Sequence, residues 1–173
     1  REPWQERWGT LDPKWKAALL GAIAENPPAP ALVPDISPIL RPRRTPPPGM
    51  FELVIRPDPA VWDGRLANNP WAQELPRPLS TLTWDNAVEI GPELAAARSL
   101  ADGDLVRLTA GARSIEGPVR IAPGQAPCAV LIHLGQGRRC GSVASGVGFD
   151  AVPLAEACFV MLEAIGGRHV LAA

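Results

Sequence analysis

The sequence lacks several features on which whole classes of protein depend. Lysine and arginine number 17 against 18 aspartates and glutamates, so the formal net charge is only −1. A nearly neutral chain has no bulk attraction for nucleic acid, and we expect no such partner. No apolar run approaches the roughly 20 residues that cross a bilayer, so we expect no direct membrane span. Residues 1–6 lack the basic start and apolar core of a signal peptide.

Metal-ligating residues are scarce as well. The three cysteines, Cys128, Cys140 and Cys158, are an odd number, widely spaced, and form neither a CxxC motif nor a disulfide framework. With only two histidines, the chain does not supply four clustered ligands for zinc or an iron–sulfur cluster. We therefore expect no metal site.

The chain is rich in proline and glycine, with 21 and 16 residues. Near the N-terminus, apolar residues at three- or four-residue spacing predict a helix from Pro13 to Glu25, with Asp12 as its N-cap. Residues 26–49 contain nine of the 21 prolines and predict an extended, polyproline-like arm. Residues 1–49 are thus expected to be a helix and arm outside the compact domain.

Short apolar runs separated by turn residues follow from Met50 onwards. Such a pattern is typical of a mainly β fold, and a closed barrel would hide the many strand edges. Strands are expected at residues 51–55, 79–84, 86–90, 105–109, 114–121 and 129–134, with a short helix at 91–97. We expect the barrel to occupy residues 50–155 and a C-terminal extension to occupy residues 156–173.

A family resemblance rests on two consecutive segments. Residues 87–97 read as a strand and a short helix, and residues 100–108 contain the turn Ala101-Asp102-Gly103-Asp104 before another strand. Together they resemble the molybdopterin dinucleotide-binding domain that closes the large subunit of the dimethyl-sulfoxide-reductase superfamily of molybdopterin oxidoreductases. Residues 118–126 are similar to the next strand and turn of that domain. The resemblance implies a double-psi β-barrel.

A longer ordered series narrows the resemblance. It comprises residues 51–59, the motif Trp62-Asp63-Gly64-Arg65, residues 67–76, residues 82–86 and residues 146–151. The series is similar to the molybdopterin-oxidoreductase-like iron–sulfur subunit of bacterial alternative complex III, a quinol-oxidising respiratory complex. This implies an electron-transport assembly, membrane-associated on the periplasmic side, with its other subunits or domains as partners. The catalytic and ferredoxin-like regions of those subunits have no counterpart here, so we do not expect the chain to be an enzyme by itself.

The candidate binding site is the glycine-rich loop at residues 134–146. Glycines let backbone amides approach a pyrophosphate, and Arg138 with Arg139 would neutralise it. The aspartates at 102, 104 and 150 would accept hydrogen bonds from a guanine, and the pair at 68–69 fits either the cofactor's edge or ordinary turn chemistry. The predicted cofactor-binding residues are Asn68, Asn69, Asp102, Gly135, Gly137, Arg138, Arg139 and Asp150.

Two functions remain open on this basis. One is a structural or docking domain of a respiratory electron-transfer subunit that keeps the barrel without a cofactor. The other is a genuine binding module for molybdopterin guanine dinucleotide that completes an oxidoreductase active site in trans. No catalytic residue is predicted, because His133 lies on an apolar strand without an obvious acidic partner and no nucleophile–base spacing is evident.

Overall fold

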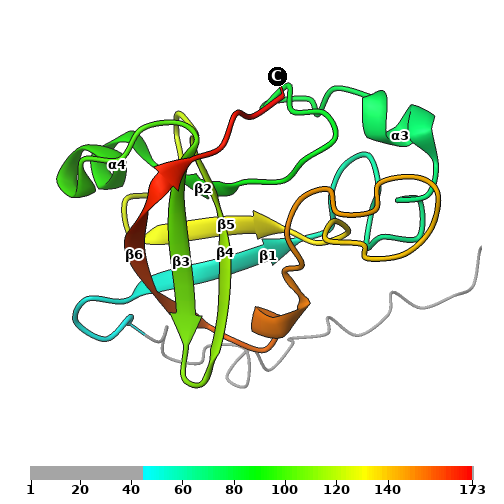
Figure 1. Ribbon diagram of the computed structural model, residues 1–173. Coiled ribbons are helices and arrows are strands. Elements are labelled where there is room, and N and C mark those ends of the chain that lie inside the picture. The colour runs from blue at the N-terminus through cyan, green and yellow to red at the C-terminus, as the bar shows by residue number, and fades with distance from the viewer. Residues whose placement is uncertain (1–44, 173) are drawn as a thin grey trace, which may run out of the picture. The chain divides into compact units, whose positions relative to one another are not determined.

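The computed structural model describes residues 45–172 (Figure 1). The predicted helix from Pro13 to Glu25 and most of the proline-rich arm lie outside the described residues. Within the described part of the chain, no helix is long and apolar enough to span a membrane.

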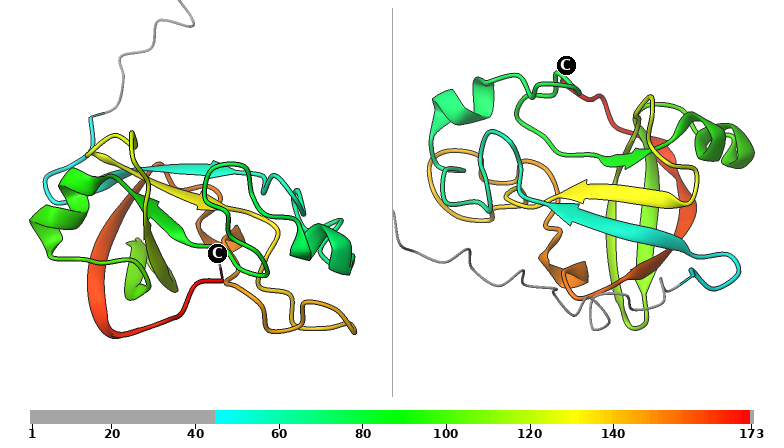
Figure 2. Two further views of the ribbon diagram at one scale, coloured as in Figure 1. Left: turned by 90° about the horizontal axis from the view of Figure 1, so that it is seen from above. Right: turned by 180° about the vertical axis from the view of Figure 1, so that it is seen from behind.

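Six strands form a closed barrel in the order β1-β5-β2-β4-β3-β6, which confirms a mainly β fold. The strands are β1 (Phe51–Arg56), β2 (Val88–Ile90), β3 (Asp104–Ala110), β4 (Arg113–Ile121), β5 (Ala129–His133) and β6 (Phe159–Arg168). Two pairs, β1 with β5 and β2 with β4, are parallel, and the remaining pairs are antiparallel. Figure 2 shows β1 and β5 side by side when the barrel is seen from behind. Each parallel pair joins strands that are distant in the sequence, so the strands cannot be linked by simple hairpins.

The core is the barrel interior. Along β3, Val106 and Leu108 are fully buried, and the residues on either side of them are only partly buried, as the two-residue period of a strand requires. Val88, Ile90, Val119, Val130, Ile132 and Val160 also have no exposed surface. Each such side chain contributes roughly 1.5–3 kcal/mol by leaving water.

Two short helices belong to the barrel domain. Helix α4 (Pro92–Arg98) has Pro92 in its first turn, as the sequence predicts, and places Leu94 and Ala95 on the core. Helix α3 (Pro70–Glu74) was not predicted. Its N-cap is Asn69, whose side-chain oxygen accepts a hydrogen bond from the backbone N–H of Trp71 at 3.1 Å. The Asn-Asn-Pro sequence is therefore a helix start as well as a turn.

The strand expected at residues 79–84 does not form. Thr81 and Trp84 have φ values of 58° and 52°, in the left-handed region that strand residues do not adopt. The backbone N–H of Thr81 bonds to the carbonyl of Arg77 and that of Trp84 bonds to the carbonyl of Gln73. The segment is a folded-back turn, and only Leu82 among its apolar residues is buried.

Strand β6 lies in the segment expected to be a C-terminal extension. Its ten residues pair with β3 along most of their length and with β1 at Phe51 and Glu52, and this second pairing closes the barrel. The barrel thus continues to Arg168, beyond residue 155. Gly166 and Gly167, both with positive φ, interrupt the apolar alternation of this strand in the sequence.

Candidate functional site

The glycine-rich loop after β5 curls beside α3 at one end of the barrel (Figures 1 and 2). Two backbone hydrogen bonds close the loop on itself: Gly137 N–H donates to Val147 at 2.9 Å and Gly146 N–H to Arg138 at 2.7 Å. Its inner side borders a surface hollow of about 450 Å³. That hollow, here called the loop hollow, is lined by Ser114, Ile115, Glu116, Gly137, Arg138, Arg139, Gly146, Gly148, Phe149, Asp150 and Pro153.

The loop hollow brings four predicted site residues together: Gly137, Arg138, Arg139 and Asp150. Arg139 is exposed, whereas Arg138 is half-buried and its Nε donates to the carbonyl of Cys140 at 2.5 Å. One carboxylate oxygen of Asp150 accepts a hydrogen bond at 2.9 Å from the N–H of Val152, the first residue of the 3₁₀ turn η1 (Val152–Leu154). The remaining donors and acceptors give this hollow the mixed polar character that a phosphate and a guanine edge need.

Asn68 lies next to this group. A Cβ atom on Gly141 would be 3.1 Å from the side-chain oxygen of Asn68 and 3.0 Å from Nε of Arg138, so all three residues meet at one point. Asn69, by contrast, uses its side chain to cap α3. The structure therefore places Asn68, but not the side chain of Asn69, against the glycine-rich loop.

Gly135 and Asp102 have structural roles away from the loop hollow. A Cβ on Gly135 would lie 2.6 Å from the carbonyl oxygen of Trp62, so the glycine permits close packing against residues 61–64. Asp102 lies in the turn before β3, where its carboxylate accepts from the N–H of Ile121 at 2.6 Å. It borders a different hollow, with Arg120, Arg168 and His169.

Buried amide side chains, which the sequence did not reveal, position the loop. Asn86 is 2% exposed and accepts a hydrogen bond from the N–H of Phe149 at 2.9 Å. Its amide nitrogen donates to the carbonyls of His133 and Phe149 at 3.1 and 3.0 Å. One side chain thus fixes both ends of the loop. Its only sequence signal is its place in the family-like segment 82–86.

A second buried pair ties the loop to α3. Gln136 donates through Nε2 to Oε1 of Gln73 at 2.9 Å, and Gln73 donates to the carbonyl of Ala67 at 3.1 Å. Gln73 has no exposed surface and Gln136 is 6% exposed. Buried amides of this kind must be hydrogen-bonded, which makes the relative placement of the two segments specific.

A buried ion pair fixes the connection between β1 and β2. Nε of Arg77 lies 3.0 Å from Oδ2 of Asp58, and the two side chains are 5% and 2% exposed. The other oxygen of Asp58 accepts from the N–H groups of Ala60 and Val61 at 2.7 and 3.0 Å. These contacts hold a cavity of about 310 Å³ next to the barrel wall.

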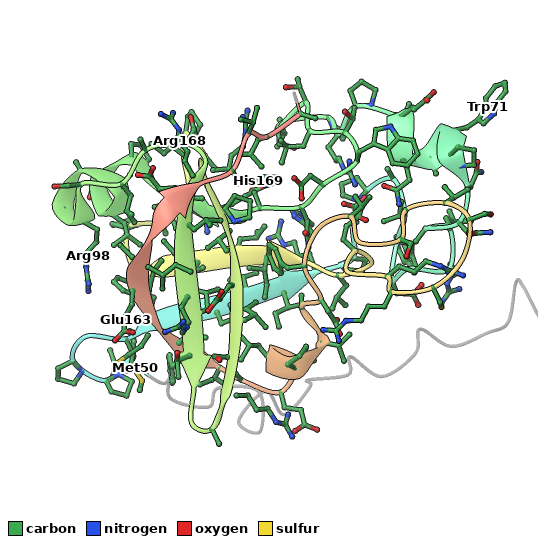
Figure 3. The ribbon with its side chains drawn as sticks, viewed as in Figure 1. Met50, Trp71, Arg98, Glu163, Arg168 and His169 are labelled. Carbon is green, nitrogen blue, oxygen red and sulfur yellow. The ribbon has the colours of Figure 1, made fainter. Side chains whose placement is uncertain are left out.

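Both histidines have acidic partners, which corrects the expectation for His133. Its Nδ1 lies 3.8 Å from Oε1 of Glu89 on the neighbouring strand β2. His169, labelled in Figure 3, follows β6 and places Nε2 2.5 Å from Oδ2 of Asp85. The spacing of 44 residues for one pair and 84 for the other left no local signal in the sequence.

The connection between β1 and β2 also carries an unusual number of exposed apolar side chains. Among the described residues, five of the eight large apolar side chains most open to solvent come from residues 62–79, and Figure 3 shows Trp71 pointing away from α3. We call this set the α3 face. Its members and their exposed fractions are Trp62 (52%), Leu66 (47%), Trp71 (83%), Leu75 (58%) and Leu79 (97%).

Comparison of the chain with protein-family models and with curated protein sequences gives no match.

Proposed function

We propose that the chain is an accessory domain of a molybdopterin-oxidoreductase-like, respiratory electron-transfer subunit, with a docking role and no catalysis of its own. The finer fold that goes with this proposal is the double-psi β-barrel. The closed six-stranded barrel and its two long-range parallel pairs, β1–β5 and β2–β4, are compatible with that topology. The same resemblance assigns the domain to a bacterial complex, membrane-associated on the periplasmic side.

The observation that carries the docking role is the α3 face. A soluble domain of this size seldom leaves several large apolar side chains in one segment open to water unless they contact a partner. Tryptophans are enriched where binding energy concentrates, because a single ring buries much area with little loss of rotamer freedom. Trp71 at 83% exposed and Leu79 at 97% exposed have almost all of their area available for this purpose.

The α3 face is also preorganised. Its segment is held from beneath by the Asp58–Arg77 ion pair and by Gln73, all of them buried. A surface that is already fixed loses little conformational entropy when a partner binds, so more of the interaction energy appears as affinity. Because buried contacts hold this segment in place, its exposed apolar side chains form an ordered surface suited to docking and not a disordered loop.

Affinity purification of the tagged full chain from membranes of the producing organism tests this function. We expect haem- and iron–sulfur-containing subunits to co-purify, identified by mass spectrometry and visible absorbance. Trp71→Ser and Leu79→Ser should each reduce their recovery by about tenfold, the effect of roughly 1.4 kcal/mol at a binding hot spot.

The matched control is Val170→Ser, which replaces another exposed apolar residue outside the α3 face (89% exposed). It should leave recovery unchanged. Recovery of the chain alone, or equal recovery with all three variants, contradicts the docking role.

The loop hollow supports a second function, binding of molybdopterin guanine dinucleotide. The observation in its favour is that Arg138, Arg139, Gly137 and Asp150 line one hollow and Asn68 adjoins it. Titration with guanosine diphosphate, followed by calorimetry, should show binding that Arg139→Gln weakens. Arg65→Gln, which removes an exposed arginine paired with Asp63 outside the lining of the loop hollow, is the control. No heat signal at millimolar nucleotide excludes this function, and co-purification of a catalytic molybdenum subunit favours it.

A further inference from the structure

We propose that the cavity beside Arg77 binds a small organic oxyanion, that is, a carboxylate or phosphate group carried on a compact apolar body. The site, here called the Arg77 cavity, has a volume of about 310 Å³, is partly open to solvent, and lies between the connection from β1 to β2 and the outside of strands β2 and β5. It shares no lining residue with the loop hollow, so it is a separate site from the one considered for a pterin dinucleotide.

The first argument is an unused hydrogen-bond donor. Arg77 lines the cavity and is only 5% exposed. Its Nε donates to Asp58 and its Nη1 to the carbonyl of Leu82, both at 3.0 Å. Its Nη2 is buried and has no hydrogen-bond partner among the described residues. A buried charged donor without an acceptor is costly, so this atom favours any ligand that brings an oxygen to it.

The second argument is the state of the charged groups around the cavity. Two of the three carboxylates in its lining are hydrogen-bonded, Asp58 to Arg77 and Asp85 to His169, and the third, Glu89, lies 3.8 Å from His133. The cations retain free donors. The side chain of Arg56 is exposed and makes no hydrogen bond or ion pair within residues 45–172, and Nη2 of Arg77 is unpaired. These two guanidinium groups in the lining carry donors without partners among the described residues, and they favour an anionic ligand.

The third argument is the apolar character of the remaining walls. Besides Ser80 and Asn86, they are formed by Pro57, Pro59, Pro78, Leu79, Leu82, Ala87 and Leu131. A volume of about 310 Å³ lies at the lower end of the range for small-molecule pockets, which are mostly apolar with a few placed polar groups. A bare inorganic ion would leave these walls without contacts. The combination points to an aromatic or short branched acid or phosphate ester.

Nuclear magnetic resonance titration of the ¹⁵N-labelled full chain tests the site with four probes: benzoate, phenyl phosphate, their uncharged counterpart benzamide, and inorganic phosphate. We expect benzoate or phenyl phosphate to shift the backbone amides of Leu82, Ala87 and His133 in a saturable way, with a Kd of about 1 mM. Benzamide should bind at least about tenfold more weakly, because it lacks the charge that Arg77 and Arg56 recognise.

Two variants assign the binding. Arg56→Gln removes an exposed guanidinium at the cavity and should raise the Kd of the better probe by about fivefold without affecting folding. Arg77→Lys removes the Nη2 donor and should raise this Kd further. If Arg77→Lys does not fold, the Kd measured with Arg56→Gln still tests whether the probe binds at this cavity. Arg107→Gln, outside the cavity lining, should leave the Kd unchanged.

Four results would overturn the proposal. These are the absence of saturation at about 20 mM probe, equal affinity for benzoate and benzamide, equal affinity for phenyl phosphate and inorganic phosphate, and equal loss in Arg56→Gln and Arg107→Gln. Leu79 belongs to both the α3 face and the cavity lining, whereas Trp71 does not line the cavity. Trp71→Ser should therefore weaken docking and leave probe binding unchanged, which separates the docking function from the oxyanion site.

Discussion

At the scale of single residues, the ion pair between Asp58 and Arg77 is the contact most sensitive to substitution. Asp58→Ala leaves the Arg77 guanidinium buried without its counter-charge and also removes the acceptor of two backbone N–H groups. We expect a loss of about 3–5 kcal/mol in the free energy of unfolding, measured by urea denaturation.

The matched control for this variant is Asp63→Ala, which breaks the exposed pair with Arg65. Exposed pairs are screened by water, so its urea midpoint should not change measurably. Similar destabilisation by both substitutions would show that burial is not what makes the Asp58 pair important.

The same exposed pair gives a prediction about pH. A side-chain hydrogen bond from Arg65 lowers the pKa of Asp63 from 3.8 to about 2. Because the pKa in the folded state is below that of the unfolded chain, the pairing favours folding above pH 3.8 and is lost as the pH falls through about 2, although water screens this fully exposed pair so that its effect on stability is small. The ¹³C carboxyl resonance of Asp63 should titrate near pH 2, and Arg65→Gln should return it to the ordinary range. An unchanged midpoint in Arg65→Gln would contradict this assignment.

At the scale of elements, the sequence predicted those whose signals are local. Five of the strands and α4 follow from apolar runs, turn residues and a proline in the first helical turn. The failures have non-local causes. Residues 79–84 look like a strand, but backbone hydrogen bonds to Arg77 and Gln73 hold them in a turn. Strand β6 was missed because its place is set by pairing with β1 and β3, which only the closed barrel provides.

Strand β6 can be tested by truncation. A chain that ends at Ala155 loses the partner of β3 and of the start of β1, together with the buried side chains of Val160 and Leu162. We expect it to lack cooperative thermal unfolding and dispersed amide resonances. Without β6, the edges of β1 and β3 are left unpaired and the core loses the buried side chains of that strand. A chain that ends at His169 retains every β6 pair and is the control. Native-like unfolding of the shorter chain would show that β6 is dispensable.

At the scale of the whole molecule, the candidate site combines local and distant contributions. The sequence identified the glycine-rich loop, and the structure brings Asn68, Gly137, Arg138, Arg139 and Asp150 to it. The sequence did not predict the buried side chains that hold the loop, because their hydrogen-bond partners are remote in the sequence. Asn86 and Phe149 are 63 residues apart, as are Gln73 and Gln136. Neither spacing corresponds to the period of any helix or strand.

The Gln73–Gln136 pair should make the α3 face and the glycine-rich loop behave as one unit. Gln136→Leu removes the loop's amide and leaves that of Gln73 with one partner fewer in a fully buried position, at a cost of about 1–3 kcal/mol. We expect hydrogen exchange to accelerate in residues 70–75 as well as in residues 135–148. The double variant Gln73→Leu/Gln136→Leu should recover part of the lost free energy of unfolding, because neither leucine leaves a buried amide without a partner. The double-mutant cycle formed by these variants should give a coupling energy of about 0.5–3 kcal/mol between the two positions. Gln125→Leu, in the turn before β5, should show no coupling to Gln73. If exchange in Gln136→Leu becomes faster only in the loop, α3 is held independently of it. Binding of a partner to the α3 face would then not affect the conformation of the loop.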